Sequence, residues 1–347
     1  MLIGCTSSAE PEETPNSNTT DEHDVEHEHD DSTETLSLPE LGAAALNGRK
    51  LTVVATTSII GDVVAQVGGE AIDLTILMEA GQDPHSYEPG AQELTAVADA
   101  DVIFINGWDL EESLVDSLES IGEEALVVPI SANIHPLAFG EDEHEHEGEE
   151  AEHEEEDEHD EGEHHHSGAD PHVWFSIHNV EQWMENVEHV LSELDPTHAG
   201  TYEANATAYM TELAELEAYA EAQLAPIPTE KRFLVTNHDS FGYFAEEYDF
   251  TVLGTVIPSI STAAEPSASD LTDLIAEMEE HTVCTIFTET TVNDTLAQTV
   301  ASELSGCDAV QVLKLYTGAV GSEGSGAESY IGMFRTNIDT IVDGLKQ

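Results

Sequence analysis

Short apolar, β-branched segments alternate with helical segments along most of this 347-residue chain. Residues 51–56, Leu-Thr-Val-Val-Ala-Thr, are typical of a strand that is buried on both faces. A helical segment follows, and the alternation continues through the two halves of the chain. Alternation of this kind predicts parallel sheets with helices on both faces. We therefore expect an α/β protein with two similar Rossmann-like lobes.

Each half contains four expected strands. They cover residues 51–56, 72–78, 102–106 and 126–130 in the first half, and 232–236, 250–256, 283–288 and 309–315 in the second. The expected helices of the two lobes cover residues 58–67, 92–100, 111–121, 241–247, 270–280, 293–304 and 327–344.

Two longer helical segments, residues 177–194 and 197–224, separate the halves, and Asp195-Pro196 marks the start of the second. In that second segment apolar residues recur every three or four positions, which gives one apolar face: Tyr202, Ala206, Tyr209, Leu213, Leu216, Ala220 and Leu224. At a rise of ~1.5 Å per residue the segment is roughly 42 Å long, enough to cross a domain. We expect it to be a long, rigid helix that bridges the lobes.

These patterns divide the chain into four parts. Residues 1–48 form an acidic tether, residues 49–195 and 226–347 form the two lobes, and residues 196–225 form the linking helix. Near the start, Leu2-Ile3-Gly4-Cys5 resembles a bacterial lipobox, in which the cysteine is lipidated, so Cys5 is a candidate lipid anchor. A chance cysteine is the alternative. The sequence contains no apolar run of 18 residues that would predict a transmembrane helix.

The charge balance excludes one class of partner. The chain has 7 Lys and Arg against 74 Asp and Glu, whereas nucleic-acid binding requires basic residues that neutralise phosphates. Such an excess of negative charge is typical of proteins from high salt, where it is screened, but a bias of the lineage would give the same composition.

An acidic, histidine-rich tract interrupts the first lobe at residues 141–166, and apart from one Ala it contains only Glu, Asp, His and Gly. Such a composition cannot bury apolar surface, so we expect disorder. Its histidines are candidate weak metal ligands: His144, His146, His153, His159, His164, His165 and His166. A second cluster in the tether contains His23, His27 and His29. A solvated acidic loop without a metal role is the alternative.

Two cysteines besides Cys5 lie near the starts of expected strands, Cys284 before residues 285–287 and Cys307 before residues 309–312. If those strands are adjacent and parallel, a disulfide between the two is geometrically possible and fits an oxidising compartment. Two buried thiols remain the alternative.

Three further histidines, His85, His172 and His238, lie in loops or just past strand-like runs, which is where open α/β sheets bind ligands. Neutral imidazole is a common zinc ligand, and zinc takes about four donors in a tetrahedron. The three are far apart in the sequence, so only the tertiary fold can bring them together, and spacing alone is a weak signal.

The segments around these histidines resemble those of the zinc/manganese solute-binding proteins of ABC importers. The resemblance rests on residues 83–89 (DPHSYEP), 170–174 (DPHVW) and 237–244 (NHDSFGYF), with further likeness at 265–268 and 286–289. It implies two lobes bridged by a long helix, with a divalent metal bound between them by His85, His172 and His238. It also implies capture of the metal outside the cytoplasmic membrane, lipid anchoring, and delivery to a membrane permease with its ATPase.

The resemblance also bears on which metal is bound. Manganese-type relatives have a carboxylate where this chain has His238, and an Asp at the position of Gly318. Three imidazoles without that Asp favour Zn²⁺ as the transported ion, although copper or nickel would also suit such a site. For the fourth ligand we expect water, with Glu289 or a loop carboxylate as alternatives. Glu88 and Asp239 are candidates for orienting the histidines, and Trp174 for lining the site.

Other functions remain possible from the sequence. The main alternative is a manganese-binding or other divalent-metal protein, or a surface adhesin or metal buffer. A zinc hydrolase also uses three histidines and a water, but no accompanying nucleophile or general-base motif is present, so we expect no enzymatic activity. We expect a monomer that binds no nucleic acid.

Overall fold

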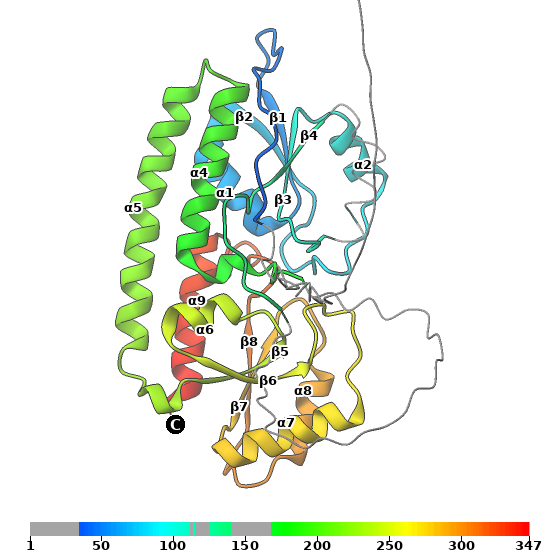
Figure 1. The fold of residues 1–347 in the computed structure, drawn as a ribbon, viewed down its shortest axis with the longest axis vertical. Helices are drawn as coiled ribbons and strands as arrows, with labels where there is room; N and C mark the ends of the chain where they lie inside the picture. Colours follow the sequence, from blue (N-terminus) through cyan, green and yellow to red (C-terminus); the bar gives the residue numbers. More distant parts are fainter. Residues whose placement is uncertain (1–34, 112–113, 115–124, 140–167, 347) are drawn as a thin grey trace, which may run out of the picture. The chain divides into compact units, whose positions relative to one another are not determined.

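A computed structural model describes residues 35–111, 114, 125–139 and 168–346. It contains two four-stranded parallel sheets (Figure 1). The first has the order β2-β1-β3-β4, with β1 (Leu51–Ala55), β2 (Ile72–Ile76), β3 (Val102–Ile105) and β4 (Leu126–Pro129). The second has the equivalent order β6-β5-β7-β8, with β5 (Phe233–His238), β6 (Thr251–Ile257), β7 (Thr285–Glu289) and β8 (Gln311–Leu315). The expectation of two similar α/β lobes with parallel sheets is therefore confirmed.

The helices follow the predicted order, with ends that differ by a few residues. They are α1 (Ser58–Gly68), α2 (Ala91–Ala98), α4 (Ile177–Leu194), α5 (Ala199–Leu224), α6 (Gly242–Tyr248), α7 (Ala268–His281), α8 (Thr295–Glu303) and α9 (Tyr330–Leu345). A 3₁₀ turn over Val173–Phe175 precedes α4. The helix expected at residues 111–121 falls almost entirely outside the described residues, as do Cys5 and the histidine-rich tract.

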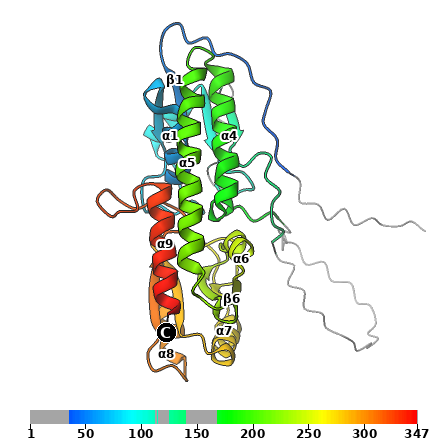
Figure 2. The ribbon, with the colours of Figure 1, turned by 90° about the vertical axis from the view of Figure 1, so that its left-hand side faces the viewer.

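The long helix α5 has the apolar face that the sequence predicts, because all seven of the recurring residues are buried. It packs against α1 and α4 of the first half and against α9 of the second, and Figure 2 shows it running alongside them. The helix starts at Ala199, two residues later than expected, because Asp195 holds the preceding turn. The Asp195 carboxylate accepts a hydrogen bond from the Thr197 backbone N–H (3.2 Å) and lies 2.6 Å from His198 Nδ1.

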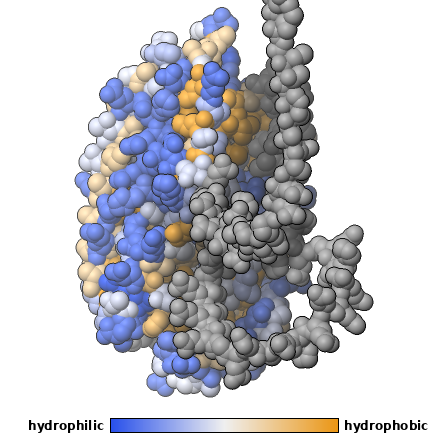
Figure 3. Space-filling model, in the orientation of Figure 1, coloured by the Kyte–Doolittle hydropathy of each residue, from blue (hydrophilic) through white to orange (hydrophobic). Residues whose placement is uncertain are grey.

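The apolar core is continuous between the two halves. One cluster of buried side chains extends from α1 and α4 through α5 to α9, and it includes Trp183, Tyr202 and Phe334. Smaller clusters cover the other face of each sheet, around Ile103 in the first and Ile286 in the second. Hydrophilic residues predominate over α4 and α5 in Figure 3. Since separating the halves would expose the shared core to water, this arrangement favours a stiff link between them.

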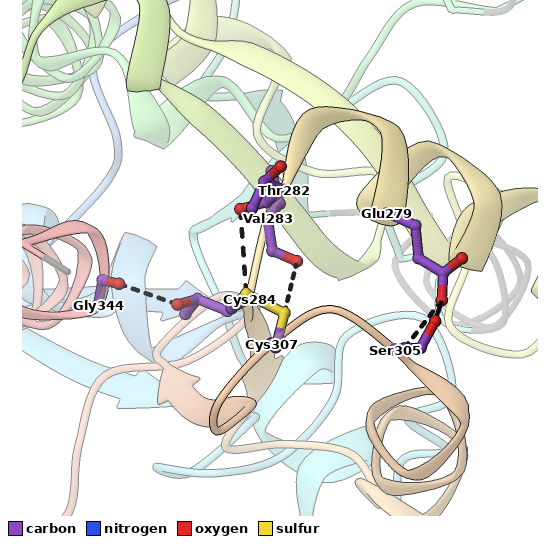
Figure 4. The surroundings of a disulfide bond; sticks show 8 residues. Glu279, Thr282, Val283, Cys284, Ser305, Cys307 and Gly344 are labelled. Carbon is purple, nitrogen blue, oxygen red and sulfur yellow. Dashed lines mark hydrogen bonds between the residues drawn. A yellow bond between two sulfur atoms is a disulfide. The ribbon is translucent and has the colours of Figure 1, made fainter.

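A disulfide joins Cys284 to Cys307 (Figure 4). The sequence left a disulfide and two buried thiols as alternatives, and the structure has the disulfide. It lies at the ends of β7 and β8 that are opposite to His238 and Glu289, and it closes a segment that contains α8. Nearby, Thr285 Oγ1 donates to the Gly344 carbonyl at the end of α9 (2.9 Å). These bonds stabilise the end of the second sheet remote from the three histidines.

Among the described residues, no helix is long and apolar enough to span a membrane.

Candidate metal site

Three histidines from separate parts of the chain meet between the two sheets. His85 lies in the loop after β2, His172 directly precedes the 3₁₀ turn before α4, and His238 is the last residue of β5. The Nε2 atom of His172 is 3.2 Å from that of His85 and 3.1 Å from that of His238. One nitrogen from each ring lies within 4.8 Å of the other two. The structure therefore brings together the three histidines that the sequence singles out.

The His85 loop is fixed by Asp83. One oxygen of this carboxylate accepts a hydrogen bond from the His85 backbone N–H (3.1 Å). The other accepts from Ser86 Oγ (3.1 Å) and from Thr262 Oγ1 (2.6 Å), which belongs to the loop after β6. The Asp-Pro-His segment thus makes a turn that orients the histidine and contacts the second half of the chain.

Asp170 fixes the orientation of His172. Its Oδ1 atom lies 2.9 Å from the His172 backbone nitrogen and 2.8 Å from Nδ1. With the Nδ1–H donating to the carboxylate, Nε2 presents its lone pair to the other histidines. Gly242 leaves room for this carboxylate, since a Cβ there would be 2.9 Å from Asp170 Oδ2.

Glu289, the last residue of β7, has the same role at His238. Its Oε1 atom contacts Nδ1 of His238, and its Oε2 accepts a hydrogen bond from Thr317 Oγ1 (2.5 Å). The Thr317 carbonyl in turn accepts from the Trp174 indole N–H (2.8 Å). A chain of polar contacts therefore connects His238 with the segment that follows His172.

The electrostatics of the site follow from burial and from these two carboxylates. Burial, with the neighbouring imidazoles, lowers the pKa of His85 to about 3 and lowers the pKa of His172 strongly. Burial also acts to lower the pKa of His238, but Glu289 outweighs it and the net shift is upward. The same pairing lowers the pKa of Glu289 against the opposing effect of its burial.

This arrangement is suited to a metal ion. With Nδ1 of His172 and of His238 each paired to a carboxylate, their Nε2 atoms face each other at 3.1 Å, and two deprotonated nitrogens repel at this distance unless a proton or a metal ion lies between them. Two imidazole nitrogens on a tetrahedral zinc, at about 2.0–2.1 Å from the metal, are roughly 3.3 Å apart. The observed separations are close to that value.

The sequence identified the three histidines but not all of their partners. The sequence suggested that Asp239 and Glu88 orient the histidines. In the structure, Asp170 contacts Nδ1 of His172 and Glu289 contacts Nδ1 of His238. Asp170 directly precedes Pro171-His172, so the Asp-Pro-His motif itself indicates a partner for His172. Glu289 is also an alternative for the fourth ligand, and its carboxylate contacts His238 and Thr317. Trp174 lies against His172, with ring centroids 5.4 Å apart.

Gly318 lies beside the His85 loop. A Cβ at this position would be 2.6 Å from Pro84 Cδ and 3.2 Å from its Cγ. The glycine supplies no side-chain ligand, and its small size lets Pro84 pack directly against the backbone. Any side chain here would require the His85 loop to shift.

Comparisons with known proteins agree with the fold and the site. Residues 53–344 match the family model ZnuA, described as zinc-uptake complex component A, periplasmic. The manganese-binding lipoprotein MntA of Halalkalibacterium halodurans is 36% identical over 301 residues, covering 87% of this chain and 90% of the relative. The equivalent protein of Bacillus subtilis is 31% identical over 303 residues, covering 86% and 90%.

Solved structures of metal-binding proteins are similar to this chain in fold. The periplasmic zinc-binding protein TroA of Treponema pallidum superposes with a TM-score of 0.73 at 28% identity, over 86% of this chain and all of that one. A manganese-bound periplasmic metal-binding protein mutant from Candidatus Liberibacter asiaticus has a TM-score of 0.72 at 28% identity, over 85% and 100%. The chain therefore belongs to the ZnuA family of metal-binding solute-binding proteins of ABC importers, which are extracytoplasmic binding proteins and not enzymes.

Proposed function

We propose that this protein captures Zn²⁺ with His85, His172 and His238 and delivers it to the permease of its importer. One observation carries the proposal: three imidazole nitrogens converge, with His172 Nε2 3.1–3.2 Å from the other two, and two of the rings have their Nδ1 atoms paired with buried carboxylates. Nitrogen-rich sites favour zinc over manganese, which prefers oxygen donors.

The residues around the triad support the same choice of ion. Glu289 is engaged by His238 and Thr317, and Gly318 offers no carboxylate where manganese-type relatives are expected to have one. A water molecule is then the simplest fourth donor. We infer that Glu289 acts as a positioning residue that raises the basicity of His238 and holds its ring.

Manganese is the second candidate, because curated relatives at 36% and 31% identity carry manganese in their names. The two proposals differ in the donor set. If manganese is the natural ion, we expect oxygen donors to join the triad, and Glu289 would be one source of them if it turned away from Nδ1 of His238.

The experiment is direct metal competition on the full chain. Apo protein is titrated with Zn²⁺ and with Mn²⁺ by calorimetry, and each metal is then challenged with the other. Tight equimolar zinc binding that excess manganese does not displace supports the proposal. Tighter binding of Mn²⁺ than of Zn²⁺ would overturn it in favour of the second candidate.

Three further features remain proposals. Cys5 would attach the chain to the membrane through a lipid, and the tract at residues 141–166 would hold additional zinc weakly at high local concentration. Deletion of residues 141–166 should remove weak zinc binding beyond one equivalent and preserve the tight site.

We also propose that the protein works as a monomer.

A further inference from the structure

A second group of metal-ligating side chains lies on three helices, outside the three-histidine site. It consists of His178 on α4, Glu217 on α5 and Glu247 on α6, and one ligand atom from each lies within 4.8 Å of the other two. Figure 2 shows these helices next to one another. His178 Nε2 is 3.6 Å from Glu217 Oε1, and His178 Nδ1 is 3.7 Å from Glu247 Oε1. Nothing in the capture of metal at His85, His172 and His238 uses this group.

The group includes a carboxylate oxygen in an unfavourable environment. Glu247 Oε1 is buried and accepts no hydrogen bond within the described part of the chain. Burial raises the pKa of the adjacent Tyr248, and the Glu247 carboxylate adds to this rise through its charge and through a hydrogen bond with the Tyr248 hydroxyl. An unpaired buried carboxylate oxygen is unfavourable, and a bound cation would satisfy it.

The surrounding charge is negative. In the residues that the structure describes, the ion pairs of Glu217 and Glu247 are made with His178, and none is made with Lys or Arg. Nearby, burial raises the pKa of Glu181, and the Glu217 and Glu247 carboxylates add to that effect. A divalent cation would neutralise this excess.

We propose that His178, Glu217 and Glu247 bind a second divalent cation, Zn²⁺ or a metal of similar character, with water completing its coordination. Histidine nitrogen and carboxylate oxygen are both zinc ligands at about 2.0–2.2 Å, which places donors roughly 3.3 Å apart in a tetrahedron. The two distances given above involve different nitrogens of His178, and when a single nitrogen of this ring is counted the three donors lie within 4.8 Å of one another. The side chain of His178 is 64% exposed, so its ring is free to turn one nitrogen toward the ion.

The second cation would connect α6 to the bridging helices. Since α6 begins four residues after His238, an ion held by all three helices would fix the segment that follows this ligand. This inference goes beyond metal capture between the lobes, and it does not depend on which metal the three-histidine site prefers.

The test follows the imidazole of His178 in the ¹⁵N-labelled full chain by two-bond ¹H–¹⁵N correlation spectra, with the signal assigned by its loss in His178→Gln. Zn²⁺ is added beyond one equivalent. We expect a saturable shift of one His178 ring nitrogen. The apparent affinity should fall at least about tenfold in Glu217→Gln and in Glu247→Gln, because each removes a charged ligand.

Glu277→Gln is the matched control, because Glu277 pairs with His281 at 3.8 Å on α7 and the described residues supply no third ligand to that pair. It should leave the His178 response unchanged. A His178 signal that does not respond, or that responds alike in all three Glu→Gln variants, would overturn the proposal. Glu217 is the more exposed of the two ligands, so Glu217→Gln decides if Glu247→Gln fails to fold. The response should persist in His85→Ala, which separates this site from the first.

Discussion

The Asp170 carboxylate holds His172 at two points, with Oδ1 2.9 Å from the backbone nitrogen and 2.8 Å from Nδ1. A backbone bond and a ring bond to one oxygen fix both the turn and the tautomer of this histidine. The site is therefore organised before any ion arrives, and little conformational entropy remains to be lost on binding.

Replacing His172 with Ala should abolish the tight equimolar metal site, with a loss of affinity of at least about 100-fold, since the ring lies between the other two imidazoles. Calorimetric titration of the full chain with Zn²⁺ measures this loss of affinity. His189→Ala on α4 is the control, because that histidine is exposed and should leave the affinity unchanged. The assignment is wrong if the two variants bind zinc equally well.

Replacing Glu289 with Gln should weaken zinc binding by about 10- to 100-fold without removing the site, because the triad remains but His238 loses its charged partner. Thr317→Val deletes only the hydroxyl that donates to Glu289 and should have a smaller effect in the same direction. Equilibrium competition with a chromophoric chelator resolves both. Loss of the equimolar site in Glu289→Gln would instead make this carboxylate a ligand.

Zinc affinity should rise with pH between about pH 6 and about pH 8. The pKa of His238 is raised by Glu289, and burial raises the pKa of Asp170 to about 7, so both groups carry protons on the acidic side of this range. Metal binding requires His238 to lose its proton and favours ionised Asp170, so protons are released on binding. His85 and His172, with lowered pKa values, contribute none. Calorimetry in buffers of different ionisation enthalpy counts the protons, and an affinity independent of pH contradicts this account.

Removing the disulfide with Cys284→Ala and Cys307→Ala together should lower the free energy of unfolding by about 3 kcal/mol, given the separation of 23 residues between the cysteines. Zinc affinity should stay the same, because the bond lies at the opposite end of its strands from His238 and Glu289. Denaturant unfolding of the metal-free protein, with and without reductant, measures the first effect. Equal stability of the oxidised protein and the double variant would show that the bond contributes nothing.

Much of the fold follows from local patterns in the sequence. The strand around Val53 and the apolar face of α5 are long, regular signals, and the structure places them as expected. Helix ends were less predictable, because they depend on side-chain contacts such as those of Asp195 with Thr197 and His198. The spacing of apolar residues does not predict such contacts.

In the candidate metal site, too, some features follow from local sequence patterns and others depend on tertiary contacts. The Asp-Pro-His segments and the family resemblance identified His85 and His172, but the pairing of His238 with Glu289 joins residues 51 positions apart on neighbouring strands. No local pattern in the sequence specifies such a contact. It becomes visible only when the order of the sheet places β5 beside β7.

Replacing Gly318 with Asp should shift the preference of the site from zinc toward manganese, because it adds a carboxylate beside the His85 loop. The substitution also introduces a Cβ 2.6 Å from Pro84 Cδ, so the loop must move. Gly318→Ala carries the same steric change without the carboxylate and is therefore the matched control. Competition between Zn²⁺ and Mn²⁺ on both variants gives the ratio of affinities. We expect at least a roughly tenfold lower zinc-to-manganese ratio for the Asp variant than for the Ala variant, in line with the preference of manganese for oxygen donors. Equal ratios would mean that a side chain at position 318 does not reach the metal, and that the selectivity of the site is set by the three imidazoles alone.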